Sequence, residues 1–188
     1  MARPQENIQK FKELILYISQ NSADDPAFGS VKLNKLLFFS DFVSFAYNGA
    51  AITGAEYMKL ELGPGPRHLV PVREEMIRDG ELGIQEKAKV MSGTVQQKPV
   101  NLREPNLDLF SAKEIALVDS VIRSLATRSA NDTSRLSHMM CAWKLAPMGS
   151  TIPYGAVFLS DSPLTEPDKV RGQELAKEYN LLEQSTAA

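Results

Sequence analysis

The residues that could form a catalytic or metal site are few and stand apart in this sequence. His68 and His138 are the only two histidines. Neither belongs to a cluster of ligating side chains at the spacing of a zinc site. Ser137 precedes His138, but consecutive side chains on a helix point apart, so they do not form a nucleophile–base pair. The sequence therefore predicts no metal site, no cofactor and no catalytic residue.

Two uncharged or acidic polar residues stand out on a largely apolar segment. Asn34 and Asp41 lie seven residues apart, about two turns along one stripe of a helix. They can bond to neighbouring backbone groups, or they can form a polar anchor at the edge of a partner groove. Catalysis by Asp41 is a third interpretation, although no second carboxylate is placed to share acid–base work.

The segment Gly63-Pro64-Gly65-Pro66 precedes Arg67 and His68. It has the glycines of a phosphate-binding loop, but each proline lacks the backbone N–H that such a loop supplies. The Lys and Ser/Thr of a P-loop are absent as well. We interpret the segment as a rigid turn between a strand and a helix.

Length and composition predict one soluble domain. The chain has 188 residues, of which 43% are hydrophobic, and a formal net charge of -2. Charge alone therefore does not favour a nucleic-acid partner, and no apolar run approaches the length of a membrane span. The polar N-terminus does not resemble a secretory signal. Cys141, the single cysteine, lies in an apolar context and is expected to be a buried thiol in a cytoplasmic protein.

Hydrophobic periodicity predicts an α+β fold that is predominantly helical, with about six helices around a central apolar helix and a small antiparallel sheet or hairpin. The central helix is expected to begin after an N-cap at Ser30 and to end at Asn48-Gly49. Its apolar residues surround nearly the whole helix, so it must be buried. A first amphipathic helix is expected on Ile8, Phe11, Leu14, Ile15 and Ile18.

The remaining elements follow from alternation and capping signals. Glu56–Leu62 alternates and predicts a half-buried strand, with Met58, Leu60 and Leu62 inward and Tyr57, Lys59 and Glu61 exposed. As an edge strand, it could accept a partner strand. A helix is expected after Pro71, followed by a hairpin whose arms are Ile84–Val90 and Thr94–Val100 and whose turn is Met91-Ser92-Gly93. A Ser111–Glu114 capping box predicts the start of the next helix. A short helix from Asp132 or Thr133 should carry Trp143 as a core anchor, and a last helix is expected after Thr165.

Four blocks of this sequence resemble the Panacea domain family, the SocA-like antitoxins. They are KLNKLLFFSD at Lys32–Asp41, ITGAEYMKLELGPGPR at Ile52–Arg67, LSHMMCAWK at Leu136–Lys144 and IPYGAVFL at Ile152–Leu159. They occur in family order, so residues 1–188 are expected to form a single Panacea-like domain. The blocks cover about 31–159, between an N-terminal helix and loop (1–30) and a C-terminal helix and tail (160–188).

The resemblance implies a bacterial or phage antitoxin whose partner is a cognate protein toxin, with no cofactor and no catalytic residue. Direct masking of the toxin is one mechanism, and delivery of the toxin to an energy-dependent cellular protease is the alternative. A third hypothesis is a small enzyme using Asp41, Arg67 and His138. The expected partner-binding residues are the polar or amphipathic positions of the first two blocks: Asn34, Asp41, Tyr57, Lys59, Glu61 and Arg67. The toxin and the oligomeric state stay open.

Overall fold

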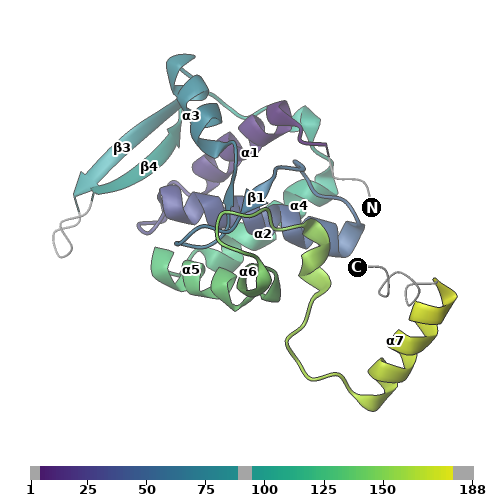
Figure 1. Cartoon of the computed structure of the whole chain (residues 1–188). Coiled ribbons are helices and arrows are strands. Elements are labelled where there is room, and N and C mark those ends of the chain that lie inside the picture. Colours follow the sequence, from purple (N-terminus) through teal and green to yellow (C-terminus); the bar gives the residue numbers. More distant parts are fainter. Residues whose placement is uncertain (1–4, 89–94, 180–188) are drawn as a thin grey trace.

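The computed structural model describes residues 5–88 and 95–179, and the described part is predominantly helical, as predicted (Figure 1). It contains seven α-helices, two short 3₁₀ helices and two separate two-stranded antiparallel sheets. In chain order these are α1 (Ile8–Asn21), α2 (Ser30–Asn48), β1 (Tyr57–Met58), β2 (Gly65–Pro66), α3 (Leu69–Arg78), β3 (Leu82–Ala88), β4 (Val95–Asn101), η1 (Leu107–Leu109), α4 (Ala112–Leu125), α5 (Ala130–Met139), α6 (Cys141–Leu145), η2 (Tyr154–Phe158) and α7 (Glu166–Glu178).

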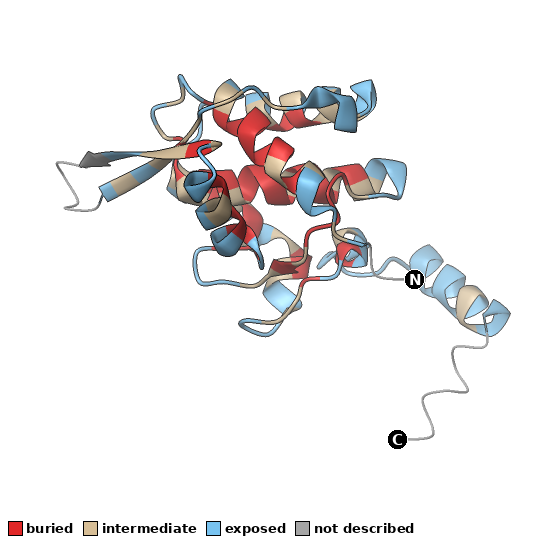
Figure 2. Cartoon of the chain, turned by 90° about the horizontal axis from the view of Figure 1, so that it is seen from above, coloured by how far each residue is buried: buried red, intermediate tan, exposed pale blue. Residues whose placement is uncertain are grey.

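Helix α2 is the central element of the fold, as its composition predicts. It packs against α1, α4, α5 and η2, and Figure 2 shows the buried positions, in red, gathered in the helical body of the molecule. Leu33, Leu37, Phe38 and Phe42 are completely buried. A helix with apolar side chains on every face is stable only when other elements cover all of them.

The ends of α2 differ in how well the sequence predicted them. Gly49 adopts the left-handed conformation at φ 71° and its N–H bonds to the Phe45 carbonyl, so the predicted end is confirmed. The predicted N-cap is wrong, because Gly29 occupies that position and makes no side-chain cap. Ser30 is the first helical residue, and its hydroxyl instead donates to the Gln97 carbonyl of β4 and accepts a hydrogen bond from Arg73.

The predicted strand Glu56–Leu62 is much shorter in the structure, and the predicted exposure is wrong at Tyr57, Leu60 and Leu62, although Glu61 is exposed as predicted. Only Tyr57–Met58 is a strand, paired with Gly65–Pro66. Tyr57, expected on the exposed face, is 1% exposed, whereas Leu62, expected inward, is 61% exposed. The phenol of Tyr57 finds a buried carboxylate partner, described below, so a side chain with a polar tip occupies the core.

The strand β1 is also not an open edge. Residues 149–152 run along its other side, where Met58 and Thr151 form an antiparallel bridge. The Lys59 N–H donates to the Ser150 carbonyl, and the Ile152 N–H donates to the Tyr57 carbonyl. Addition of a partner strand to this edge is therefore blocked by the chain itself.

Helix α3 begins before Pro71 rather than after it. Pro71 is the third residue of the helix, where a backbone N–H has no intrahelical acceptor, so the missing donor costs little. The hairpin β3–β4 confirms the predicted pairing, with Leu82 opposite Asn101 and Ala88 opposite Val95. Its predicted turn, Met91-Ser92-Gly93, lies outside the described residues.

The capping signals of the C-terminal half are largely confirmed. The Ser111–Glu114 capping box opens α4, and a second box from Thr165 opens α7 with a proline in the first turn. The single helix expected through Trp143 is wrong. Met140 adopts an extended conformation (φ -68°, ψ 132°) and divides it into α5 and α6, and α5 begins two residues earlier than the first predicted start.

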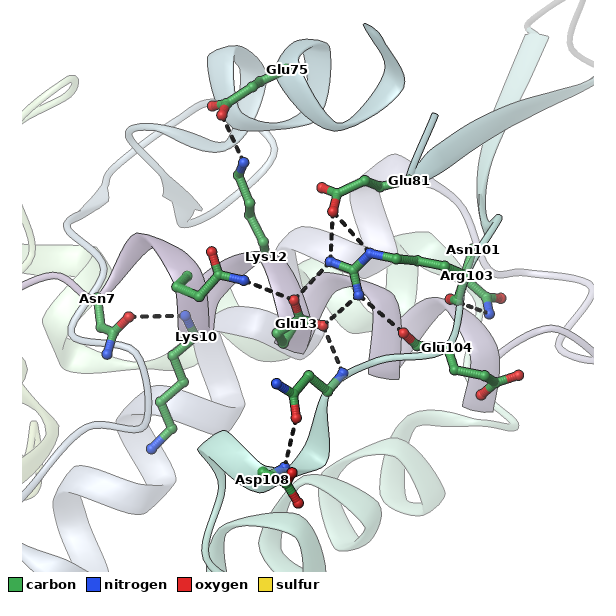
Figure 3. Close-up of polar contacts among 12 residues, drawn as sticks. Asn7, Lys10, Lys12, Glu13, Glu75, Glu81, Asn101, Arg103, Glu104 and Asp108 are labelled. Atoms are coloured by element: carbon green, nitrogen blue, oxygen red, sulfur yellow. Dashed lines mark hydrogen bonds and ion pairs between the residues drawn. The ribbon is translucent and has the colours of Figure 1, made fainter. Parts of the chain in front are cut away.

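A buried ion pair that the sequence did not reveal fastens α1 to the segment after the hairpin (Figure 3). The guanidinium of Arg103 bonds both carboxylate oxygens of Glu13, at 2.7 and 2.8 Å, and also contacts Glu81 at 2.8 Å. The Asn106 N–H donates to the same Glu13 carboxylate. Glu13 is 1% exposed, so these bonds compensate for a carboxylate removed from water.

Candidate partner-binding surface

Asp41 lies in the core and joins three parts of the chain. Its carboxylate accepts hydrogen bonds from the Thr53 N–H (2.7 Å), the Thr53 hydroxyl (2.5 Å) and the Tyr57 hydroxyl (2.8 Å). The Tyr154 hydroxyl lies 3.4 Å away and donates to the Ala55 carbonyl at 2.7 Å. Burial raises the pKa of Asp41 above its ordinary value, while the bonds from Thr53 and Tyr57 act in the opposite direction.

Aromatic rings surround this carboxylate and exclude water from it. The rings of Phe42 and Tyr154 lie 4.7 Å apart, and the ring of Phe38 meets that of Tyr57 edge-on at 5.4 Å. Burial and the nearby Asp41 carboxylate raise the pKa of Tyr57 and Tyr154 far above the ordinary value for a phenol. The cluster therefore fixes α2, β1 and η2 relative to one another.

The turn from Gly63 to Pro66 lies directly on α2. The ammonium of Lys35 donates to the Pro64 carbonyl at 2.9 Å. Gly63 has φ 96°, and a Cβ there would lie 2.6 Å from the Ser137 hydroxyl and 2.8 Å from the Lys35 ammonium. A side chain at Gly63 would thus be strained in backbone and in contact. The turn is a packed element, as predicted, and not an open anion cradle.

Lys35 is a basic side chain in an apolar site. It is 1% exposed, and burial lowers its pKa to about 7. Beside it, a Cβ on Gly65 would lie 3.4 Å from the amide nitrogen of Asn34, and the amide oxygen of Asn34 is buried without a partner among the described residues. Asn34 and Lys35 thus support the turn from beneath.

Lys59 projects beside an aromatic stack on the neighbouring α5–α6 segment. The rings of His138 and Trp143 are stacked at 4.0 Å with an interplanar angle of 15°. The Lys59 ammonium lies 4.3 Å from the Trp143 ring centroid and donates to the Lys144 carbonyl. Burial, together with the positive charges of Lys35 and Lys59, lowers the pKa of His138. Trp143 is half-buried rather than a full core anchor.

Arg67 lies at the other end of the turn and is 39% exposed at its side chain. Its guanidinium pairs with Glu56 at 3.0 Å and contacts the Thr151 hydroxyl at 3.3 Å. Glu61 lies between Lys59 and Arg67 in the sequence, and its side chain is exposed. We call Lys59, Glu61 and Arg67, with the Trp143 face beside Lys59, the turn surface.

The six predicted partner-binding residues thus fall into two layers. Asp41 and Tyr57 bond to each other in the core, and Asn34 lies under the turn. Lys59, Glu61 and Arg67 are at least partly exposed. The prediction that they contact a partner stays a prediction. Lys35 and Trp143, which were not selected from the sequence, complete this region. The sequence signal for Lys35 is a lysine within a largely apolar helix, and Lys32 shares that signal.

The three residues of the enzyme hypothesis have separate surroundings. Asp41 bonds within the core cluster, Arg67 pairs with Glu56, and His138 stacks on Trp143. His68, the other histidine, lies 2.6 Å from a Glu6 carboxylate oxygen. Within the described ranges, no three His, Cys, Asp or Glu side chains gather as a metal site would require. Nothing in this geometry joins Asp41, Arg67 and His138 into one reaction site.

A second surface feature is an open apolar groove between α2, α4 and α5, with a volume of about 500 Å³. Residues four apart on α2 and a facing stripe of α4 form its walls. The lining residues are Phe39, Val43, Tyr47, Leu117, Ser120, Val121, Ser124, Leu125 and Leu136. None of them is charged.

Comparison with known proteins identifies the family of the chain. The family model described as antitoxin SocA-like, Panacea domain matches residues 33–144, which is more than half of the chain. The protein therefore belongs to the SocA-like antitoxin family with a Panacea domain, and the resemblance seen in the sequence is confirmed. No curated protein and no solved structure matches the chain. In the part of the chain that the structure describes, no helix is long and apolar enough to span a membrane.

Proposed function

We propose that this protein is an antitoxin that binds its cognate protein toxin directly and masks the toxin's active surface. Family membership carries this proposal, because the matched segment contains the central helix, the turn surface and the aromatic stack. Buried side chains hold this region rigid from beneath. A preorganised surface loses little conformational entropy on binding, which favours a stable complex.

The turn surface is the region we propose for the contact. It combines lysine, arginine and tryptophan side chains, and tryptophan and arginine are enriched among residues that dominate binding energy. Lys59 has no carboxylate partner among the described residues; its ammonium bonds a carbonyl and lies over the Trp143 ring. An acidic group of the toxin would therefore meet an uncompensated charge at Lys59.

The geometry favours binding over catalysis. The only buried carboxylate of the matched first block, Asp41, is surrounded by Thr53, Tyr57 and the aromatic rings. It is completely buried, so no substrate reaches it in this conformation. The mechanism that follows is steric: an interface of standard size, roughly 800 Å² on each partner, would cover the toxin.

Co-expression with the product of the adjacent gene tests the proposal. The antitoxin should restore growth, and the two chains should co-purify. The same experiment in protease-deficient cells separates masking from delivery to a protease, since masking persists there and delivery does not. Rescue without any detectable complex would overturn direct masking.

A further inference from the structure

Three basic side chains gather at the turn surface: Lys35 of α2, Lys59 after β1 and His138 of α5. We call them the basic cluster. The Lys59 ammonium lies 4.3 Å from the centroid of the Trp143 ring, and the His138 ring stacks on the same indole at 4.0 Å. Lys35 and Lys59 both lie close enough to His138 for their charges to act on it. Three separate segments of the chain thus bring basic groups to one place.

No acidic group balances this cluster in the described part of the chain. Each lysine bonds a neutral carbonyl instead of a carboxylate, Lys35 that of Pro64 and Lys59 that of Lys144. Burial lowers the pKa of Lys35 to about 7. The charges that act on His138 are those of the two lysines, and both are positive. The positive charge of the cluster is therefore uncompensated in the free protein.

The stacked rings are also short of hydrogen-bond acceptors. Nε2 of His138 and Nε1 of Trp143 are buried and have no partner among the described residues. A charged imidazole donates from both ring nitrogens, so protonation of His138 would leave a buried donor unsatisfied. The free protein thus disfavours the charged forms of His138 and Lys35 for one shared reason, which is that no anionic side chain of the described residues faces them.

A carboxylate placed against Lys59 would change this balance. It would compensate the positive charge, and the partner surface around it would exclude water and strengthen the attraction. Lys59 and Trp143 are partly exposed, so a partner can reach the cluster on this side. Lys35 is 1% exposed and would respond to the partner's charge without touching it. Both His138 and Lys35 should then bind a proton more tightly in the complex than in the free protein.

We propose that the turn surface binds an acidic side chain of the toxin at Lys59, and that this contact is coupled to proton uptake by His138 and Lys35. The inference rests on the proposed function, because the partner is the toxin assigned there. It adds the chemistry of the contact and its dependence on pH.

The sign of the pH dependence follows from linkage. Below pH 7 Lys35 is charged in both the free and the bound protein, so its contribution to the affinity is constant there. Above pH 7 the free protein loses this proton and the complex must recover it from solution, so the affinity falls as pH rises. Each proton taken up weakens binding by at most about tenfold per pH unit.

Calorimetric titration of the full-length protein with the purified product of the adjacent gene tests the inference. The affinity should be about three- to tenfold weaker at pH 8.5 than at pH 6.5. At pH 7.5 the measured heat should differ between phosphate and Tris buffers, which release protons with different enthalpies, and the difference should correspond to net proton uptake. Added sodium chloride should weaken the wild-type complex more than that of Lys59→Gln, because salt screens the ion pair that the variant lacks.

Substitutions locate the protons. Lys35→Met and His138→Gln should each reduce the uptake, because each removes one group that accepts a proton. Lys113→Met is the matched control on an exposed position of α4 and should leave the uptake unchanged. Because His138 is partly exposed, His138→Gln keeps the test decisive if Lys35→Met does not fold.

The contrary results separate this inference from the proposed function. A complex with equal affinity at pH 6.5 and 8.5, or with equal heats in the two buffers, would overturn the inference while the antitoxin function stands. Uptake that persists in Lys35→Met and His138→Gln would also overturn it, because the protons would then bind elsewhere. Equal salt dependence of the wild type and Lys59→Gln would overturn the acidic contact. No complex at any pH would overturn the proposed function, and this inference with it.

Discussion

The Tyr57 hydroxyl donates a hydrogen bond of 2.8 Å to the Asp41 carboxylate, and both residues are at most 1% exposed. This bond joins the strand β1 to the central helix across the core. Because the carboxylate also accepts two bonds from Thr53, the segment that leads into the turn surface is held at both of its ends. The position of that surface thus depends on the Asp41 carboxylate, which is completely buried beneath it.

Tyr57→Phe should destabilise the protein by about 1–3 kcal/mol, because a buried carboxylate loses one of its donors while the ring stays in place. Chemical denaturation monitored by circular dichroism measures the change. Tyr47→Phe is the matched control, since Tyr47 is 83% exposed and should behave as wild type. Equal stability of the two variants would contradict the role assigned to the Tyr57–Asp41 bond.

The sequence predicted the elements of this fold better than their exposure. The apolar helix around Leu36, the capping box at Ser111 and the hairpin could be predicted because their signals are local. The facing of Tyr57 could not, since alternation indicates two faces and does not say which one is buried. The core carboxylate of Asp41, contacted from Thr53 and Tyr57, is what places the tyrosine inside.

The contacts around the selected site residues could be predicted only in part, and the role of these residues in binding a partner stays a prediction. Asn34 and Asp41 were selected as polar residues on a largely apolar helix. In the structure Asn34 lies under the turn, and Asp41 accepts hydrogen bonds in the core. The ion pair of Glu13 with Arg103 joins residues 90 positions apart, and no local pattern indicates such a pair. The stack of His138 on Trp143 depends on the break at Met140, where the sequence predicted a continuous helix.

Lys35 predicts a dependence of stability on pH. Its pKa is about 7 in the folded protein, against 10.5 as the ordinary value. Between these values the unfolded chain binds a proton that the folded chain does not, so the free energy of unfolding should rise as pH increases from about 7 to 9. Lys35→Met should abolish most of this rise.

Denaturation curves at pH 6, 7, 8 and 9 would measure both proteins. The Lys35→Met variant should be at least as stable as wild type near pH 6, where the buried charge is least favourable in the native protein. A wild-type stability that does not change between pH 7 and 9 would contradict the lowered pKa. Lys113→Met, on an exposed position of α4, is the control.

Arg103→Met should destabilise the protein by about 3–5 kcal/mol, because it leaves the Glu13 carboxylate buried without its counter-ion. The double variant Glu13→Gln with Arg103→Met should recover part of this loss, since the unpaired charge is gone. Thermal denaturation of the single and double variants provides the comparison. Arg171→Met is the control and should have little effect, because it disrupts an exposed pair in α7. A double variant no more stable than Arg103→Met alone would contradict the claim that the unpaired Glu13 charge causes the loss.

Leu36→Ala should cost about 2–5 kcal/mol, because it opens a cavity beside the central helix of the domain. Leu36 is 1% exposed, whereas Val70 on α3 is 61% exposed, so Val70→Ala serves as the control with almost no expected change. The midpoints of guanidinium denaturation measure both. Comparable midpoints for the two variants would show that α2 is not the organising element.

The central proposal is that the turn surface binds a protein toxin. Titration of the purified protein with its toxin in a calorimeter tests it most directly. Lys59→Glu and Arg67→Glu should each weaken the affinity, with circular dichroism spectra that match wild type. Arg78→Glu, a charge reversal on an exposed position of α3, should bind as wild type does. Unchanged affinity in both turn-surface variants would contradict the account.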